Sequence, residues 1–346
     1  MSMTLFWTFP VEPVLNGLVS RRSAVRSGRM RVRVALISVF VLVTLGSHAP
    51  NVITPAAPPP AIGFVTYKAV GNVRGLSGRL RLEGAWEMES NDPRFGGLSA
   101  IHVEGEQLTA FSDSGWLIRT PLPGRRSTVR AWIELLPGMG PSADAKADRD
   151  VEAMAVLGPL AWVILERRNE AIRYHREGWR RDSSATPPAM EKWRANYGAE
   201  AMLRLPDGRF LVFSEGKGGL SDALMFSGDP STPGTAAILM KYRPPAGYRI
   251  TDAALAPDGR MLLLNRQLNL LKGGFVAKVT AAPIPETRTG AVIEGEEIAD
   301  LARPLSDNME GLSVTREGGR SILWMASDNN YNSVQRTLLL KLVLKD

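Results

Sequence analysis

The sequence contains five copies of one pattern, and this repeat limits the possible folds more than any other feature. In each copy, a small or acidic residue precedes a short apolar strand, a tight turn follows, and a second strand ends on an acidic or amide residue. The equivalent small residues of the five copies are Gly97, Ala153, Ala201, Ala253 and Gly311, spaced 56, 48, 52 and 58 residues apart. A period near 50 residues, built from strands without helical periodicity, predicts a β-propeller.

Each copy is expected to form one blade of four antiparallel strands, so the predicted fold class is all-β with five or six blades. The C-terminal segment 336–344 is expected to be a third strand, and segment 79–89 can supply the missing fourth. Pairing these two strands would close the ring and remove exposed sheet edges. Segment 64–76 could belong to a degenerate sixth blade. The polar segment 178–197 is expected to form a helix and loop over one face. In the first copy the strands are predicted at 98–103, 107–112, 116–122 and 129–136.

The N-terminus has the features of a targeting segment. Three arginines within 29–33 precede an uncharged run over 34–45, and small residues follow at Ser47 and Ala49. A basic start, an apolar run of about twelve residues and a small-x-small site describe a secretory signal peptide. The run is shorter than the roughly 20 apolar residues of a spanning helix, and an uncleaved anchor is the alternative. We therefore predict export to the periplasm. The predicted divisions are a leader over 1–49, for which Met30 is an alternative start, a Pro/Ala-rich linker over 50–63 and a propeller domain over 64–346.

Charge and cysteine content narrow the possible partners. The chain has 42 basic and 35 acidic residues and a net charge of +7. The first 49 residues hold six arginines and one acid, so the remainder has a net charge of only +2. A high positive charge was the main argument for a nucleic-acid partner, and the part of the chain after the first 49 residues does not have one. The absence of cysteine excludes disulfides and thiolate sites. We expect an anionic small-molecule substrate, and contact with a membrane only through an uncleaved leader. The oligomeric state stays open.

Two rows of polar residues recur at the ends of the two inner strands. Because antiparallel neighbours place the start of one strand beside the end of the other, both rows should meet at one mouth of the central channel. The row at the start of the first strand is Ser99, Glu152, Glu200, Asp252 and Glu310. The row at the end of the second strand is Asp113, Glu166, Glu215, Asn265 and Asp328. Asn265 thus stands where the other copies carry a carboxylate.

So many carboxylates in one place require cations or raised pKa values. Oxygen ligands without cysteine, and with few histidines, favour Ca²⁺ over zinc. The predicted metal ligands are Asp113, Glu152, Glu166, Glu200, Glu215, Asp252, Glu310 and Asp328, and the predicted catalytic subset is Glu152, Glu200, Asp252 and Glu310. Basic residues lie among the acids and could bind an anion through the arginine fork. These predicted substrate-binding residues are Arg167, Arg168, Lys217, Arg266 and Arg336.

Structural interpretations of the same residues are also open. Aspartate and asparagine at strand ends often cap turns, which would explain single members such as Asp113 or Asn265. The pair Glu166-Arg167 could be an ion pair between blades.

The blade motifs resemble those of the phytase-like family, described as having esterase-like activity of phytase. The similar pieces include Phe-Gly-Gly-Leu-Ser at 95–99, Glu-Arg-Arg-Asn at 166–169 and Asn-Tyr-Gly-Ala-Glu-Ala at 196–201. The most specific are Asp-Asn-Met-Glu-Gly-Leu at 307–312 and the ending from Ser-Asp-Asn-Asn at 327–330. The resemblance covers about residues 64–346 and implies an exported β-propeller with phosphoesterase or esterase activity.

Three functions compete at this point. The first is a Ca²⁺-dependent hydrolase of phosphoesters or other esters at the mouth of the channel. The second is a non-catalytic periplasmic binding or scaffold propeller, in which the acidic ring holds a structural cation. The third is a hydrolase similar to lactonase-type propellers. A propeller hosts all of these functions, so the fold alone does not separate them. Arginines that point into the mouth would favour a hydrolase of anions, and arginines paired on the rim would favour a scaffold.

Overall fold

The computed structural model describes residues 61–71, 74–139, 148–193, 197–216 and 219–345. These residues all belong to the second of two compact units, 49–346. The predicted leader over 1–49 and most of the predicted linker therefore lie outside the described residues. β1 (Ala61–Ala69) already begins within the last three residues assigned to the linker. Within the described part of the chain, no helix has the length and apolar character needed to cross a membrane.

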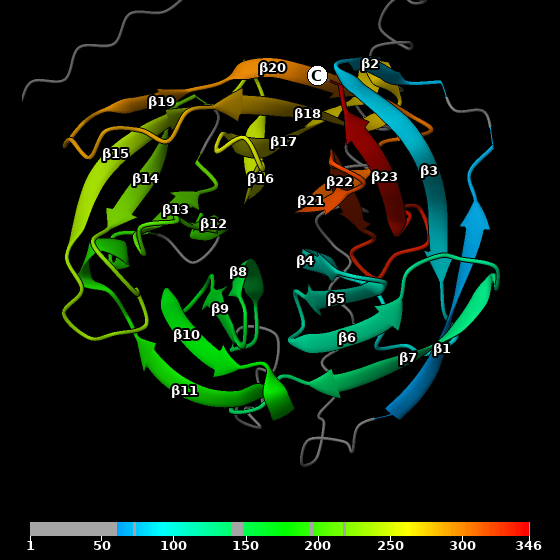
Figure 1. The fold of residues 1–346 in the computed structure, drawn as a ribbon, viewed down its shortest axis with the longest axis horizontal. Coiled ribbons are helices and arrows are strands. Elements are labelled where there is room, and N and C mark those ends of the chain that lie inside the picture. Colours follow the sequence, from blue (N-terminus) through cyan, green and yellow to red (C-terminus); the bar gives the residue numbers. More distant parts are fainter. Residues whose placement is uncertain (1–60, 72–73, 140–147, 194–196, 217–218, 346) are drawn as a thin grey trace, which may run out of the picture. The chain divides into compact units, whose positions relative to one another are not determined.

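The described residues form five four-stranded antiparallel blades, arranged in a ring (Figure 1). Blade 1 contains β4 (Leu98–Glu104), β5 (Gln107–Ser112), β6 (Trp116–Pro121) and β7 (Thr128–Leu135). Blade 2 contains β8 (Val151–Leu157), β9 (Leu160–Leu165), β10 (Glu170–His175) and β11 (Arg180–Ala185). Blade 3 contains β12 (Ala199–Arg204), β13 (Phe210–Ser214), β14 (Ser221–Phe226) and β15 (Ala237–Arg243). Blade 4 contains β16 (Arg249–Leu255), β17 (Met261–Asn269), β18 (Gly274–Ala282) and β20 (Glu296–Leu301). Blade 5 contains β21 (Asn308–Glu317), β22 (Arg320–Asp328), β23 (Leu338–Leu344) and β3 (Leu80–Glu89).

Shorter elements complete the fold. β19 (Val292–Glu294) adds a parallel strand outside β15, and β2 (Leu76–Gly78) adds an antiparallel strand outside β20. The three short 3₁₀ helices in the described residues are η1 (Glu177–Trp179), η2 (Pro188–Met190) and η3 (Leu270–Lys272).

The innermost strands of the blades contact one another in the order β4, β8, β12, β16, β21 and back to β4. The ring therefore has five blades. The N-terminal strand β3 pairs with the C-terminal strand β23, as predicted for closure of the ring. The predicted degenerate sixth blade is wrong, because β1 instead pairs with both β3 and β7. It joins the outer edges of blades 5 and 1 into one nine-stranded sheet.

The predicted lid over 178–197 is also wrong. Its residues from Arg180 to Ala185 form β11, the outermost strand of blade 2, and the only helical parts described there are single 3₁₀ turns. The sequence Arg-Arg-Asp-Ser-Ser-Ala has no apolar alternation, because an outermost strand buries little of either face. Its backbone pairing with β10 holds it in place instead.

The core consists of five apolar clusters, one between each pair of neighbouring blades. The cluster between blades 1 and 2, for example, includes Phe111, Leu117, Val163 and Tyr174, all fully buried. The other four clusters mix side chains of two adjacent blades in the same way. Because both faces of a blade are covered, the inner strands are apolar along most of their length, and polar residues collect at their ends.

Candidate functional site

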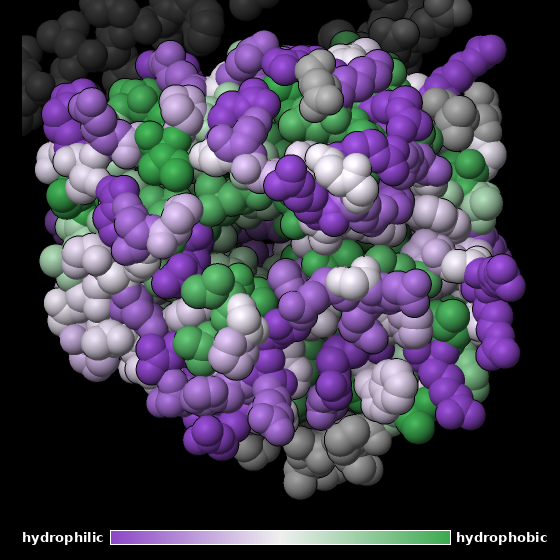
Figure 2. Space-filling view, in the orientation of Figure 1, coloured by the Kyte–Doolittle hydropathy of each residue, from purple (hydrophilic) through white to green (hydrophobic). Residues whose placement is uncertain are grey.

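The first strand of every blade contains a β-bulge at the same place. The pairing with the second strand shifts there by one residue, so one residue is left without a cross-strand partner. These unpaired residues are Ser99, Glu152, Glu200, Thr251 and Glu310. Since the first strands line the axis, the five residues form an inner ring at one end of the channel. The space-filling view is hollowed at the centre of the blades (Figure 2).

A second ring follows from the same pairing. In each blade, the residue before the bulge pairs with one residue of the second strand. In the order of the blades, these partners are Ser112, Leu165, Ser214, Asn265 and Ser327. The residue after each of these partners lies at the mouth, directly after the strand in blades 1 to 3 and still within the strand in blades 4 and 5. The resulting outer ring is Asp113, Glu166, Glu215, Arg266 and Asp328.

The predicted alignment of the fourth copy is therefore shifted by one residue. The structure places Thr251 and Arg266, rather than Asp252 and Asn265, at the ring positions. Asp252 instead accepts backbone N–H bonds from Leu312 of blade 5 at 2.6 Å and from Ala253 at 2.7 Å. Asn265 is fully buried within blade 4, where its amide accepts a hydrogen bond from the Tyr242 hydroxyl at 2.8 Å. Asp252 and Asn265 therefore form hydrogen bonds in the packed interior, and neither belongs to the inner or the outer ring.

The hydroxyl residues of the inner ring connect neighbouring blades. Ser99 donates to the carbonyl oxygen of Val151, and Thr251 donates to the carbonyl oxygen of Met309 at 2.9 Å. In both cases the acceptor directly precedes the bulged glutamate of the next blade. The hydroxyls thus fix the backbone that carries Glu152 and Glu310.

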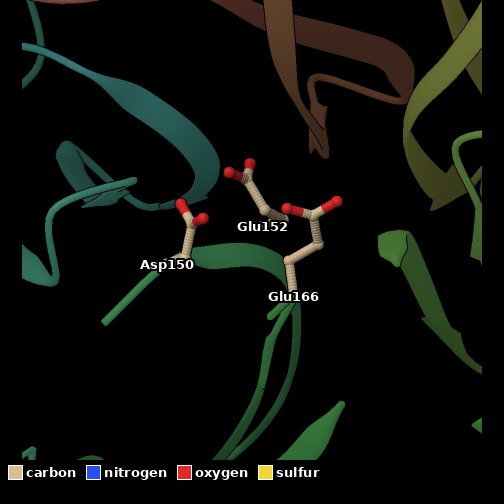
Figure 3. Close-up of side chains that lie close together, drawn as sticks. All are labelled: Asp150, Glu152 and Glu166. Atoms are coloured by element: carbon tan, nitrogen blue, oxygen red, sulfur yellow. The ribbon is translucent and has the colours of Figure 1, made fainter. Parts of the chain in front are cut away.

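One carboxylate cluster has the spacing of a cation site. Asp150 directly precedes β8, Glu152 is its second residue, and Glu166 directly follows β9. One carboxylate oxygen from each residue lies within 4.8 Å of the other two. The three side chains converge in the close-up (Figure 3). Arg167 Nε donates to Asp150 at 3.1 Å, and the Gly198 N–H donates to Glu166 at 3.0 Å, which orients two of the three carboxylates.

This donor set fits a hard divalent cation. Its ligand atoms are all carboxylate oxygens, and two of the three residues are buried, which makes simultaneous negative charge costly. Burial and the nearby Asp150 and Glu200 raise the pKa of Glu152 well above its usual value. Burial, with Asp150 and Glu215, raises the pKa of Glu166 to about 7. Either a cation or a proton must therefore offset the repulsion, and the cluster can hold a metal ion.

A second cluster surrounds Arg266. Its guanidinium bonds to Glu310 and to the Asn308 side-chain oxygen, and lies 3.7 Å from Glu215. Asn308 also donates to Glu310 Oε1 at 2.9 Å and to Asp328 at 3.4 Å. Burial alone would lower the pKa of Arg266, but the surrounding glutamates raise it above its usual value. Arg266 is therefore a permanent positive charge at the mouth.

The pKa values of three further ring carboxylates, Glu200, Asp328 and Glu310, are raised by the same crowding. Burial, then Glu215 and Glu166, raises the pKa of Glu200 well above its usual value. Burial, then Asp113 and Glu310, does the same for Asp328. Burial raises the pKa of Glu310 to about 7, although Arg266 opposes this shift.

The other predicted anion-binding residues lie mostly in ion pairs. Arg336 donates to the fully buried Asp307 at 3.2 Å and to the carbonyl oxygens of Pro304 and Ser306, so it holds the loop before β21. Arg168 pairs with Glu170 at 2.9 Å and is about half exposed. Lys217 lies outside the described residues. Among the described members of the predicted set, Arg266 is the one that reaches the inner ring.

Sequence reasoning missed Asp150 and Asn308. Each residue stands two positions before a bulged glutamate, in Asp150-Val151-Glu152 and in Asn308-Met309-Glu310. Both side chains belong to the mouth clusters, Asp150 in the carboxylate triad and Asn308 through its hydrogen bonds to Glu310 and Asp328. An acidic or amide residue two positions before the inner-ring acid was thus the available signal.

The fold and the site together define a class, a five-bladed propeller whose channel mouth carries carboxylates around one partly buried arginine. The sequence matches the phytase-like family, described as "esterase-like activity of phytase", over residues 93–331. The match covers more than half of the chain, and the chain belongs to this family.

Comparison with other proteins adds only distant similarities. No match was found among curated proteins. Among solved structures, the glutaminyl cyclase of Myxococcus xanthus has 11% identity and a TM-score of 0.43, covering 77% of this chain and 97% of its own. The allergen Mala s 1 of Malassezia sympodialis has 8% identity and a TM-score of 0.42, covering 71% and 92%. The Cellvibrio cellulosa α-L-arabinanase, complexed with arabinohexaose, has 12% identity and a TM-score of 0.41, covering 70% and 90%.

Proposed function

We propose that this protein is an exported, metal-dependent hydrolase of phosphoesters or other esters, with its site at the mouth of the propeller channel. The observation that carries the proposal is the triad Asp150, Glu152 and Glu166 beside the Arg266–Glu310 pair. A cation site next to the guanidinium of Arg266, which is 19% exposed, suits an ester whose oxygens gain negative charge during hydrolysis. The description of the family as esterase-like supports the same reaction class.

The triad would hold the cation, with Glu200 and Asp113 as neighbouring acids of the same rings. Its oxygen ligands favour Ca²⁺ among biological metals. Such a cation, when bound, supplies Lewis acidity toward an ester oxygen and offsets negative charge.

The protein's own residues would orient the substrate and move the proton. The Arg266 guanidinium would bind a phosphoryl or carboxylate oxygen through part of its fork. Glu310 Oε1 already accepts bonds from Arg266 and Asn308, so we assign Oε2 to accept the proton of the attacking water. Asn308, bonded to both Glu310 and Asp328, would fix the orientation of this base.

The test is hydrolysis of p-nitrophenyl phosphate, p-nitrophenyl acetate and phytate by the purified protein, with Ca²⁺ or with EDTA. We expect turnover that requires the cation and is lost in Glu310→Gln and in Glu152→Gln. Asp252→Asn is the matched control, because Asp252 lies one residue away from the inner ring. Turnover that survives both glutamate substitutions would refute the proposal.

A second candidate is a non-catalytic binding or scaffold propeller with a structural cation. The specific observation in its favour is that Arg336 and Arg167 are engaged in ion pairs with Asp307 and Asp150. This candidate predicts that Ca²⁺ raises the melting temperature while none of the three esters is hydrolysed.

Export to the periplasm is part of the proposal and is supported by the leader-like N-terminal sequence. Cell fractionation and N-terminal sequencing of the protein from its native host test it. Recovery of the uncleaved chain in the cytosol would contradict it.

A further inference from the structure

One hairpin at the mouth extends further along its strands than the corresponding hairpins of blades 1, 2 and 3. In blades 1, 2 and 3 the second strand ends at or before the outer ring, whereas β17 continues four residues past Asn265, to Asn269. β18 begins at Gly274, which pairs with Asn269. Counted from the outer-ring residue Arg266, the strand continues for three residues, so at about 3.3 Å per residue the hairpin extends roughly 10 Å past the ring.

The tip of this hairpin is apolar and exposed. Leu268 and Leu270 are 39% and 42% exposed, and Leu271 is 100% exposed. Two further exposed apolar residues, Leu220 at 46% and Val334 at 53%, lie on the turns at the same end of blades 3 and 5. The mouth is therefore bordered by apolar side chains from three successive blades. Groups of exposed apolar residues on one face mark an interaction surface.

The charges next to the tip are mostly positive. Lys272 follows Leu271 directly and is about half exposed, although Asp300 lies 3.9 Å from its ammonium group. Arg303 lies against Gly274 at the base of the hairpin and is 44% exposed. Arg249, in the same blade, is 40% exposed, and its partner Glu215 is only 11% exposed. Two of the partner acids, Glu215 and Asp307, are 11% and 0% exposed and the third, Asp300, is 26% exposed, whereas the three cations are 40–48% exposed.

We propose that this hairpin docks the mouth of the channel onto an anionic lipid surface. A convex tip with a fully exposed leucine has no opposing wall that could form an acyl-chain pocket. It matches instead the way in which interfacial elements insert apolar side chains among lipid headgroups, with lysine and arginine at the headgroup level. This contact would be independent of the N-terminal leader. If the protein is the ester hydrolase proposed above, on which this step rests, its substrates are esters of amphiphiles held in that surface.

The absence of cysteine from the chain allows a site-specific test. Leu271→Cys in the full chain, labelled with an environment-sensitive fluorophore, reports on the tip alone, whatever the leader does. The matched control is Leu157→Cys, which is 50% exposed in the unmodified chain and lies in the β8–β9 turn at the opposite end of a blade. The probes are vesicles of phosphatidylcholine alone and vesicles of equal parts phosphatidylcholine and phosphatidylglycerol.

We expect a blue shift at position 271 with the anionic vesicles, little shift with phosphatidylcholine alone, and none at position 157. Leu268→Ser combined with Leu270→Ser should weaken this binding at least about tenfold, since the exposed two-fifths of the two side chains together account for roughly that factor. No shift at 271 with either vesicle, or equal shifts at 271 and 157, would overturn the proposal. A shift at 271 that needs no vesicles and grows with protein concentration would also overturn it, in favour of self-association. The measurement needs no turnover, so a shift retained in a Glu310→Gln background separates docking from hydrolysis.

Discussion

Replacing Asp252 by alanine separates a structural role of this carboxylate from a chemical one. Asp252 is 3% exposed, and its Oδ2 accepts the Leu312 N–H of the next blade at 2.6 Å. The substitution removes the acceptor of this N–H, and Leu312, which carries the N–H, is itself only 3% exposed. A buried donor without a partner costs about 1–3 kcal/mol.

A second contribution partly opposes this loss. Burial raises the pKa of Asp252 well above its usual value, with Glu310 adding to the shift, so the wild-type protein bears a cost for burying an acid there. We expect the free energy of unfolding of Asp252→Ala to fall by about 2 kcal/mol, which lowers the melting temperature by roughly 4 °C.

The assay is urea unfolding followed by circular dichroism, together with calcium binding by calorimetry and turnover of the native protein. The midpoint should fall with an unchanged slope, and cation affinity and turnover should stay at wild-type levels. The control is Asp300→Ala, whose partners Lys278 and Lys272 lie 3.8 and 3.9 Å away near the surface, and which should cost less than about 1 kcal/mol. Unchanged stability with lost cation binding or turnover would refute this reasoning.

Three further outcomes follow from the structure. Adding EDTA should lower the melting temperature of the wild-type protein but not of Glu152→Gln, because a cation at 100 times its Kd stabilises by about 2.7 kcal/mol; equal sensitivity of both proteins would place the cation elsewhere. Arg266→Gln should destabilise by about 3–5 kcal/mol at neutral pH, because the buried Glu310 and Glu215 lose their cationic partner. Burial raises the pKa of Glu310 to about 7, so the loss of stability measured by urea unfolding should shrink as the pH falls below this value and Glu310 takes up a proton, and a constant loss would contradict the charge argument. Burial, with Arg176 nearby, lowers the pKa of His102 to about 4. The unfolded state then binds more protons between about pH 6.5 and 4, so acidification through this window should cost up to about 3 kcal/mol, and His102→Gln should remove that part of the loss.

The repeat was sufficient to predict the blades, because each copy must bury two apolar faces and only stacking against neighbours provides the cover. It was also sufficient to predict closure by β3 and β23, since each strand lacked a partner within its own copy. β11 could not be found in this way. It is an outermost strand with polar residues, and only backbone pairing reveals it.

The site was predictable to within one residue. Both Thr251 and Asp252 are plausible at the start of β16, and a search for acids selects Asp252. The choice depends on which residue bulges, and a bulge leaves no mark on the spacing between repeats. The clue to the correct residue is the hydroxyl group that Ser99 and Thr251 share. Each of these hydroxyls donates to the carbonyl oxygen that directly precedes the bulged glutamate of the next blade.

The pairing of β3 with β23 has a consequence for how the ring can come apart. An open array of repeats frays from its ends, where the first and last units have only one neighbour each. Here the first and last blades cover each other through one apolar cluster, and β1 joins their outer edges. Partial unfolding therefore has no terminal unit from which to start, and the loss of any one blade uncovers the faces of two others.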